Sequence, residues 1–126
     1  MTVLIDSWAW IEYFRGSKAG EKVRKYIEGE NEIIISTINM AEIYRWILRF
    51  YDEKIAEEKR NFIKKRAIVI DVTEEIAIKS AKIKHKLKWG LGDSIIYATA
   101  KQEKAKVLTG DPHFKNLKDV IYIGEG

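Results

Sequence analysis

The stretch VLTGDPHF, residues 107–114, joins a run of apolar residues to a turn that contains an acidic residue. The apolar part is typical of a buried strand. Asp111 followed by Pro112 is typical of a helix start, because Asp is a preferred N-cap and Pro suits the first helical position. On local grounds Asp111 is a cap, and only the rest of the chain can show whether its carboxylate has a second role.

The same order, a short apolar run next to a helical pattern, recurs along the whole chain. Strands are expected at residues 2–6, 32–36, 67–70, 106–109 and 120–123, and helices at 7–15, 18–28, 38–51, 53–66, 74–87 and 93–104. Apolar positions in 38–51 recur with helical spacing, whereas EIIIS at 32–36 is continuous, as in a strand covered on both faces. The alternation predicts one α/β domain over residues 1–126, with a mainly parallel central sheet of four to five strands and helices on both sides.

The composition is that of a folded domain and excludes several classes of protein. Of 126 residues, 46% are apolar and 33% charged, which is typical of globular chains. The absence of cysteine excludes disulfides and thiol catalysis. No apolar run has the length of a membrane span and no signal peptide is recognised, so a cytoplasmic location is expected. The net charge of +4 permits a polyanionic partner without requiring one.

Four acidic residues follow strands or open helices. Asp6 follows the first strand, Glu42 lies in the first turns of the helix after the second strand, Asp93 opens the helix before the fourth strand, and Asp111 follows that strand. Because ligands of doubly wound sheets sit beyond the carboxyl ends of the strands, these four could meet there, although the strand order is not visible in the sequence. Each also has a structural interpretation: Asp6 and Asp111 as helix caps, Asp93 as a cap or as a carboxylate at the positive end of the helix dipole, and Glu42 as a solvated helical residue.

A cluster of carboxylates is unfavourable by itself, since like charges at short range raise one another's pKa. A hard divalent cation removes that cost. Mg²⁺ prefers oxygen ligands and keeps several waters, so a few carboxylates around an open crevice would suit it. The chemistry then available is metal-assisted hydrolysis of a phosphodiester.

In their order and spacing, four motifs resemble those of PIN-domain ribonucleases, in particular the VapC-type toxins of prokaryotic toxin–antitoxin pairs. The motifs are DS at 6–7, NMAE at 39–42, GDSIIYATA at 92–100 and LTGDPHF at 108–114. The resemblance extends from Val3 to Ile123 and therefore covers nearly the whole chain. It implies a PIN-like fold.

The resemblance also implies an acidic catalytic and metal-binding set, formed by Asp6, Glu42, Asp93 and Asp111, with flanking hydroxyls at Ser7 and Thr109. It implies an RNA substrate, Mg²⁺ or Mn²⁺ as the cofactor, and an antitoxin partner that also blocks the active site. Trp8 departs from the family pattern, in which a small polar residue is common at this position. This departure leaves the hydrogen bonding around Asp6 open.

Four further features of the sequence have less specific interpretations. His85 lies among lysines and is assigned to a solvated face, whereas His113 is close to Asp111 and could touch a substrate. Asp71 is interpreted as a turn or cap before the next helix. The turn at 90–92 is too short for a nucleotide-binding glycine fingerprint. The lysines at 79–88 and the basic run 64–66 are interpreted as solvated faces, with phosphate contact as the alternative.

Aromatic residues are numerous for one small core. Most of the following are expected to be buried, and the others to form a dimer face or a groove for a partner helix: Tyr13, Phe14, Tyr44, Trp46, Phe50 and Tyr51. This surplus and the family resemblance together predict a homodimer.

Two other functions remain open at this stage. A receiver domain has a similar length and uses acids at strand ends to bind Mg²⁺. Asp71 would then be the phosphate acceptor, but no lysine follows the strand end at 107–112 as that function needs. The other alternative is a PIN-like module that binds RNA without cleaving it.

Overall fold

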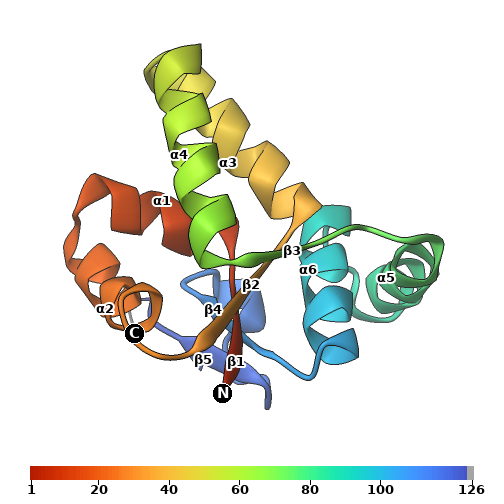
Figure 1. Cartoon of the computed structure of the whole chain (residues 1–126). Coiled ribbons are helices and arrows are strands. Elements are labelled where there is room, and N and C mark those ends of the chain that lie inside the picture. Colours follow the sequence, from red (N-terminus) through yellow and green to blue (C-terminus); the bar gives the residue numbers. More distant parts are fainter. Residues whose placement is uncertain (125–126) are drawn as a thin grey trace.

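A five-stranded sheet with helices on both faces forms the computed structural model, which describes residues 1–124 (Figure 1). The strands are β1 (Thr2–Ile5), β2 (Glu32–Ser36), β3 (Ile68–Ile70), β4 (Lys106–Thr109) and β5 (Val120–Tyr122). The helices are α1 (Ser7–Arg15), α2 (Lys18–Ile27), α3 (Thr37–Phe50), α4 (Glu53–Arg66), α5 (Glu74–Leu87), α6 (Leu91–Gln102) and the 3₁₀ helix η1 (Pro112–Phe114). The expected elements are all present. The last two residues of the expected domain, 1–126, lie outside the described part.

The strand order is β3-β2-β1-β4-β5, and every neighbouring pair is parallel. From the central strand β1 the chain builds outward through β2 to β3, and then crosses over to place β4 and β5 on the other side. The order therefore reverses between β1 and β4. In open α/β sheets such a reversal leaves a ligand crevice outside the carboxyl ends of the strands.

This strand order contradicts the receiver interpretation. Receiver folds have the order 2-1-3-4-5, which places the third strand inside the sheet, whereas here β3 is an edge strand. Asp71, which follows β3, is exposed. Asp71 is not a cap either, because the cap of α5 is Thr73, whose hydroxyl accepts from the N–H of Ile76.

The core lies on both faces of the sheet, and β1 shows why. Val3 and Ile5 pack into a cluster with residues of α1, α2, α3 and α4, while Leu4 packs on the opposite face with residues of α6 and η1. Successive side chains of a strand point to opposite faces, so a fully buried strand has to be apolar at every position. All three side chains are fully buried.

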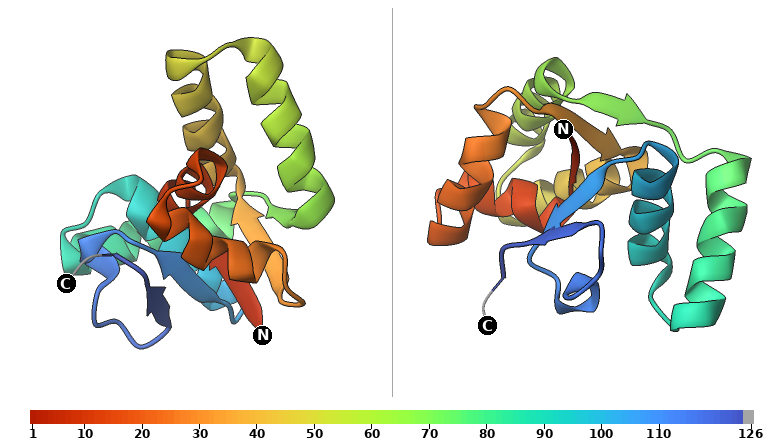
Figure 2. Two further views of the ribbon diagram at one scale, coloured as in Figure 1. Left: turned by 90° about the vertical axis from the view of Figure 1, so that its left-hand side faces the viewer. Right: turned by 90° about the horizontal axis from the view of Figure 1, so that it is seen from below.

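Two helix pairs extend away from the sheet. Figures 1 and 2 show α3 and α4 as an antiparallel hairpin that projects beyond one side, and α5 packed along α6 on the other. Within residues 1–124, no helix has both the length and the apolar character that crossing a bilayer requires.

Candidate active site

The four acidic residues named from the sequence line a single pocket of about 350 Å³. Asp6 directly follows β1 and Asp111 follows β4, so the pocket opens where the strand order reverses. Glu42 comes from α3 and Asp93 from the first turn of α6. The other lining residues are Ser7, Trp8, Ile96, Gly110 and Pro112.

Asp6 is both a helix cap and a wall of the pocket. Its Oδ1 accepts from the backbone N–H of Ala9 at 2.9 Å, and its Oδ2 accepts from the hydroxyl of Thr109. The residue is only 5% exposed. Burial raises the pKa of Asp6 from 3.8 to about 7, because desolvation outweighs these two hydrogen bonds and the charges of Asp111 and Asp93 act in the same direction as burial.

Thr109 connects this residue to the next acid. Besides donating to Asp6, its hydroxyl oxygen accepts from the backbone N–H of Asp111 at 2.9 Å. One fully buried hydroxyl thus holds the Asp6 carboxylate and the main chain of Asp111 together. Ser7 and Thr109, the two hydroxyl residues expected to flank the acidic set, each contact one of its carboxylates.

Ser7 holds Glu42 from the other side of the pocket. The Ser7 hydroxyl donates to Glu42 Oε1 at 2.5 Å and accepts from Asn39 Nδ2 at 3.0 Å. Asn39 is buried, and its Oδ1 accepts from the N–H of Ser36 in a capping box at the start of α3. The sequence interpretation gave Asn39 no role. The sequence feature that could have identified it is its position, three residues after a Ser N-cap, as in a capping box, and three before Glu42.

Of the two structural interpretations of Asp93, the cap is wrong and the position at the positive end of the helix dipole is confirmed. Helix α6 begins at Leu91, two residues before the expected start, and Gly90 is its N-cap without a side-chain hydrogen bond. Asp93 therefore lies in the first turn, where the helix dipole favours a carboxylate. Burial raises the pKa of Asp93, and the nearby charge of Asp111 adds to the rise.

Asp111 and Asp93 meet at His113. Asp111 Oδ1 accepts from the N–H of His113 at 2.9 Å, so Asp111 caps η1 as expected. The Nδ1 of His113 is 3.1 Å from Asp111 Oδ1 and 3.2 Å from Asp93 Oδ2. The three residues each offer one ligand atom, and these atoms lie within 4.8 Å of one another. His85, by contrast, is exposed on α5 and does not line the pocket.

Two glycines lie next to side chains that line the pocket. A Cβ on Gly110 would lie 2.4 Å from the ring of Trp8, and a Cβ on Gly92 would lie 3.4 Å from Glu42 Oε2. The indole of Trp8 therefore covers the backbone of Gly110 at the edge of the pocket. The departure from the family pattern at Trp8 leaves both hydrogen bonds of Asp6 in place.

The donor set fits a hard divalent ion. All four acids supply oxygen, the ligand type that Mg²⁺ prefers. Two of them have raised pKa values, which means that their negative charge is poorly compensated by the protein. His113 adds a nitrogen donor beside Asp93 and Asp111.

The expectation that most of the six aromatics are buried is wrong. Phe50 and Tyr51 are exposed, and Tyr13, Phe14, Tyr44 and Trp46 are half-buried. Three of these residues lie on α3, and Tyr51 directly follows it. The α3–α4 hairpin, which carries these four residues, projects beyond the sheet (Figure 1).

The fold resembles that of toxins from toxin–antitoxin complexes. A toxin–antitoxin complex from Klebsiella pneumoniae has a chain with TM-score 0.80 and 22% identity, and the match covers 98% of both chains. VapBC2 from Rickettsia felis, bound to a promoter DNA fragment, gives a TM-score of 0.75 with 18% identity and 97% coverage of both chains. The sarcin–ricin-loop-cleaving toxin VapC20 of Mycobacterium tuberculosis gives 0.73 with 12% identity, over 94% of this chain and 98% of that one.

The sequence itself gives the family. No curated protein shows a significant sequence match to the chain. Residues 3–120, however, match the family model described as PIN domain. That match includes all four acids of the pocket, both flanking hydroxyls and all five strands at least in part. The chain therefore belongs to the PIN-domain family.

Proposed function

We propose that this PIN domain is a metal-dependent ribonuclease and the toxin of a toxin–antitoxin pair. The observation that supports the proposal best is the meeting of Asp6, Glu42, Asp93 and Asp111 in one pocket at the reversal of strand order. Four carboxylates gathered beside a single imidazole, that of His113, are poor structural elements. They are well suited to a site that a divalent ion completes.

Asp93 and Asp111 would hold the ion, with Asp6 and Glu42 as further direct or water-mediated ligands. When bound, a divalent ion lowers the pKa of water and stabilises negative charge on phosphodiester oxygens. The protein contributes by holding the carboxylates in position. Thr109 and the Ala9 N–H fix both oxygens of Asp6, and Ser7 fixes Glu42, so these carboxylates are oriented before any substrate arrives.

The test is cleavage of a labelled single-stranded or looped RNA with and without metal. We expect cleavage in Mg²⁺ or Mn²⁺, none in EDTA, and recovery when metal is restored. Asp93→Asn removes one carboxylate charge at nearly constant shape and should abolish cleavage. Asp71→Asn, an exposed acid outside the pocket, is the matched control and should cleave like the wild type. An RNA that binds but is never cleaved would favour the non-catalytic alternative.

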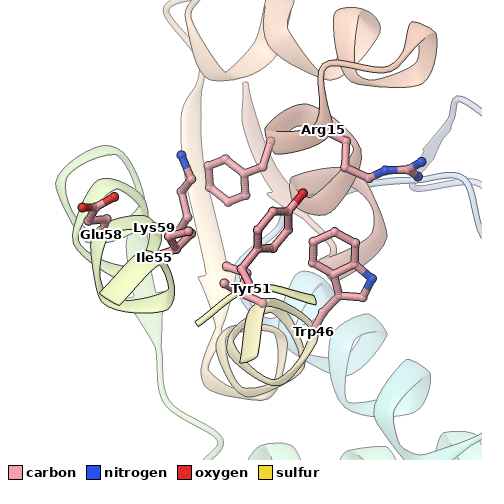
Figure 3. A pocket seen from close by; sticks show the side chains of 8 residues that line it. Arg15, Trp46, Tyr51, Ile55, Glu58 and Lys59 are labelled. Carbon is pink, nitrogen blue, oxygen red and sulfur yellow. The ribbon is translucent and has the colours of Figure 1, made fainter. Parts of the chain in front are cut away.

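The antitoxin partner would use a second pocket, of about 320 Å³, between α1, α3 and α4. Figure 3 shows the rings of Trp46 and Tyr51 together in it, with Arg15 and Lys59 at its margins. An apolar groove with a charged rim suits an amphipathic helix that carries acidic residues. The similarity to a toxin–antitoxin complex supports an antitoxin partner for the present chain, and the groove is assigned from its own lining.

Co-expression with the short open reading frame beside the gene tests this partner. We expect its product to co-purify with the wild type and not with Tyr51→Glu, which places a charge in the groove. Tyr51 is 59% exposed, so the substitution should not disturb folding. Ile78→Glu, at a residue 54% exposed on α5, is the control and should retain the partner. Retention by both variants would contradict this groove as the binding site.

We also propose that the protein forms a homodimer. Large apolar side chains remain exposed on α3, β3, α5 and α6, and a second copy of the chain would cover part of them. They include Leu48, Ile68, Ile78, Leu87 and Leu91.

A further inference from the structure

Two of the six arginines of the chain have no ion-pair partner within residues 1–124, and both lie beside the active-site pocket. Arg45 and Arg49 are exposed on α3, three and seven residues after Glu42. The others are engaged by carboxylates or backbone carbonyls: Arg15 by Glu12, Arg24 by Glu21 and Glu28, Arg60 by Glu57, and Arg66 by the carbonyls of Tyr26, Ile27, Gly29 and Asn31.

The two unpaired arginines line a groove that begins at the acidic pocket. A cavity of about 600 Å³ lies between α1 and α3 and is lined by Ile11, Glu42, Arg45, Trp46, Leu48 and Arg49. Glu42 lines this cavity as well as the pocket with the other three acids. The two hollows therefore adjoin at Glu42.

We propose that this groove, lined by Arg45, Trp46 and Arg49, binds the RNA strand next to the cleaved bond. The inference rests on the proposed ribonuclease function and adds the surface that positions the strand. Four carboxylates repel a polyanion, so a strand that reaches them needs cations close by. Arg45 and Arg49, one helical turn apart on the same face of α3, supply two.

The chemistry of the groove favours a single strand. Non-specific binding of single-stranded nucleic acid combines a positively charged groove with aromatic rings on which bases stack. Trp46 is half-buried at the groove and provides a ring, and its neighbour Arg49 lies over the ring of Phe50, 5.3 Å from the centroid. Arginine suits phosphate because its planar fork donates two parallel hydrogen bonds.

Fluorescence anisotropy with a labelled single-stranded oligoribonucleotide in EDTA tests the inference. The test variant is Arg45→Gln/Arg49→Gln, and the control is Arg24→Gln/Arg60→Gln, which removes the same net charge from arginines that are already paired. A phosphate contact to a single strand contributes about 0.7 to the slope of log affinity against log salt. The test variant should therefore bind more weakly, with a slope reduced by about 1.4, while the control keeps the wild-type slope.

Steady-state cleavage gives a second readout. The test variant should raise KM for RNA with little change in kcat, because the two arginines position the strand and do not contact the reacting bond. If the wild type cleaves RNA while the test variant retains its affinity, salt slope and KM, the groove has another occupant, such as an acidic protein segment. The inference is then wrong and the ribonuclease function stands. If the wild type neither binds nor cleaves RNA, the inferred RNA groove and the proposed ribonuclease function are both wrong.

Discussion

The hydroxyl of Thr109 donates a hydrogen bond to Asp6 Oδ2, and thereby joins two residues that are 103 positions apart in the chain. The bond crosses from the end of β1 to the end of β4, where Ile5 and Leu108 are paired in the parallel sheet. It fixes a buried carboxylate at the active-site pocket. It does not compensate for the burial, because the pKa of Asp6 remains raised to about 7.

Asp6→Asn should stabilise the metal-free protein at pH 8. Since the pKa of Asp6 is about 7 in the folded state and 3.8 is its ordinary value, the folded state binds more protons between these pH values. The free energy of unfolding therefore falls as pH rises through this window. Thermal melts in EDTA should show similar melting temperatures for variant and wild type near pH 4, and an increasing advantage of the variant toward pH 8.

Asp71→Asn is the control for that experiment, since Asp71 is exposed and outside the pocket. Its melting temperature should follow that of the wild type at every pH. A constant difference between Asp6→Asn and the wild type from pH 4 to pH 8 would show that Asp6 ionises normally.

Divalent metal should raise the melting temperature of the wild type. A ligand that binds only the folded state adds about 2.7 kcal/mol at a hundredfold excess over its Kd. Asp93→Asn should reduce the rise in Mg²⁺ or Mn²⁺, and should itself be more stable than the wild type in EDTA, because it removes a carboxylate whose pKa burial and Asp111 raise. Equal metal shifts in both proteins would exclude Asp93 as a ligand.

The positions of the acids in the sequence allowed the prediction of the pocket, because each lies next to a strand end or helix start. The strand order was not predictable in this way, since it depends on contacts between β1 and β4 that are distant in the chain. The start of α6 was also misplaced. Gly90 and Gly92 are typical of a turn, yet Gly92 is helical, and a Cβ there would make an ordinary van der Waals contact with Glu42 Oε2 at 3.4 Å.

Gly110→Ala should destabilise the protein and reduce activity. The new Cβ would lie 2.4 Å from the Trp8 ring, so the ring has to move at the edge of the pocket. Overpacking of this kind costs about 1–3 kcal/mol. Trp8→Ser in the same chain removes the clash and should restore the melting temperature in part. Gly90→Ala, where a Cβ meets nothing within 4 Å, is the comparison: it should cost less than Gly110→Ala in chemical denaturation, because it only replaces the N-cap of α6 by a poorer one.

The packing of side chains around the acids was the least predictable part of the site. Asn39 reads in sequence as an ordinary helix residue, and only the fold shows that its amide reaches Ser7 on another helix. Trp46 and Phe50 of α3 are four residues apart and share a face of the helix, which the spacing identifies without showing what covers it. In the structure Trp46 lines two hollows, one between α1, α3 and α4 and the other between α1 and α3. Figure 2 shows the α3–α4 hairpin projecting from the sheet.

The protein should sediment as a homodimer. Apolar residues are exposed on several elements, such as Leu48 at 47% and Leu91 at 53% exposure, and a second copy of the chain would cover part of them. Sedimentation velocity across a range of concentrations measures the mass directly. A single species of one-chain mass at the highest concentration would contradict the prediction.

The cleavage products should carry a 5′-phosphate and a 3′-hydroxyl. In a metal-assisted hydrolysis water is the nucleophile and the ribose 2′-hydroxyl takes no part. A histidine-driven nuclease would instead use the 2′-hydroxyl and leave a 2′,3′-cyclic phosphate. Asp6→Asn should abolish cleavage, whereas His85→Ala, at an exposed residue outside the pocket, should cleave like the wild type.

His113→Ala separates the two mechanisms most directly, because this imidazole touches both Asp93 and Asp111. If His113 only supports the acids, the variant retains cleavage, and its products have the same ends as those of the wild type. End-group analysis by enzymatic labelling of the 5′-phosphate and 3′-hydroxyl provides the measurement. Cyclic phosphate ends, or cleavage that persists in EDTA, would contradict the hydrolytic mechanism. The nucleophile would then be the 2′-hydroxyl of the RNA itself.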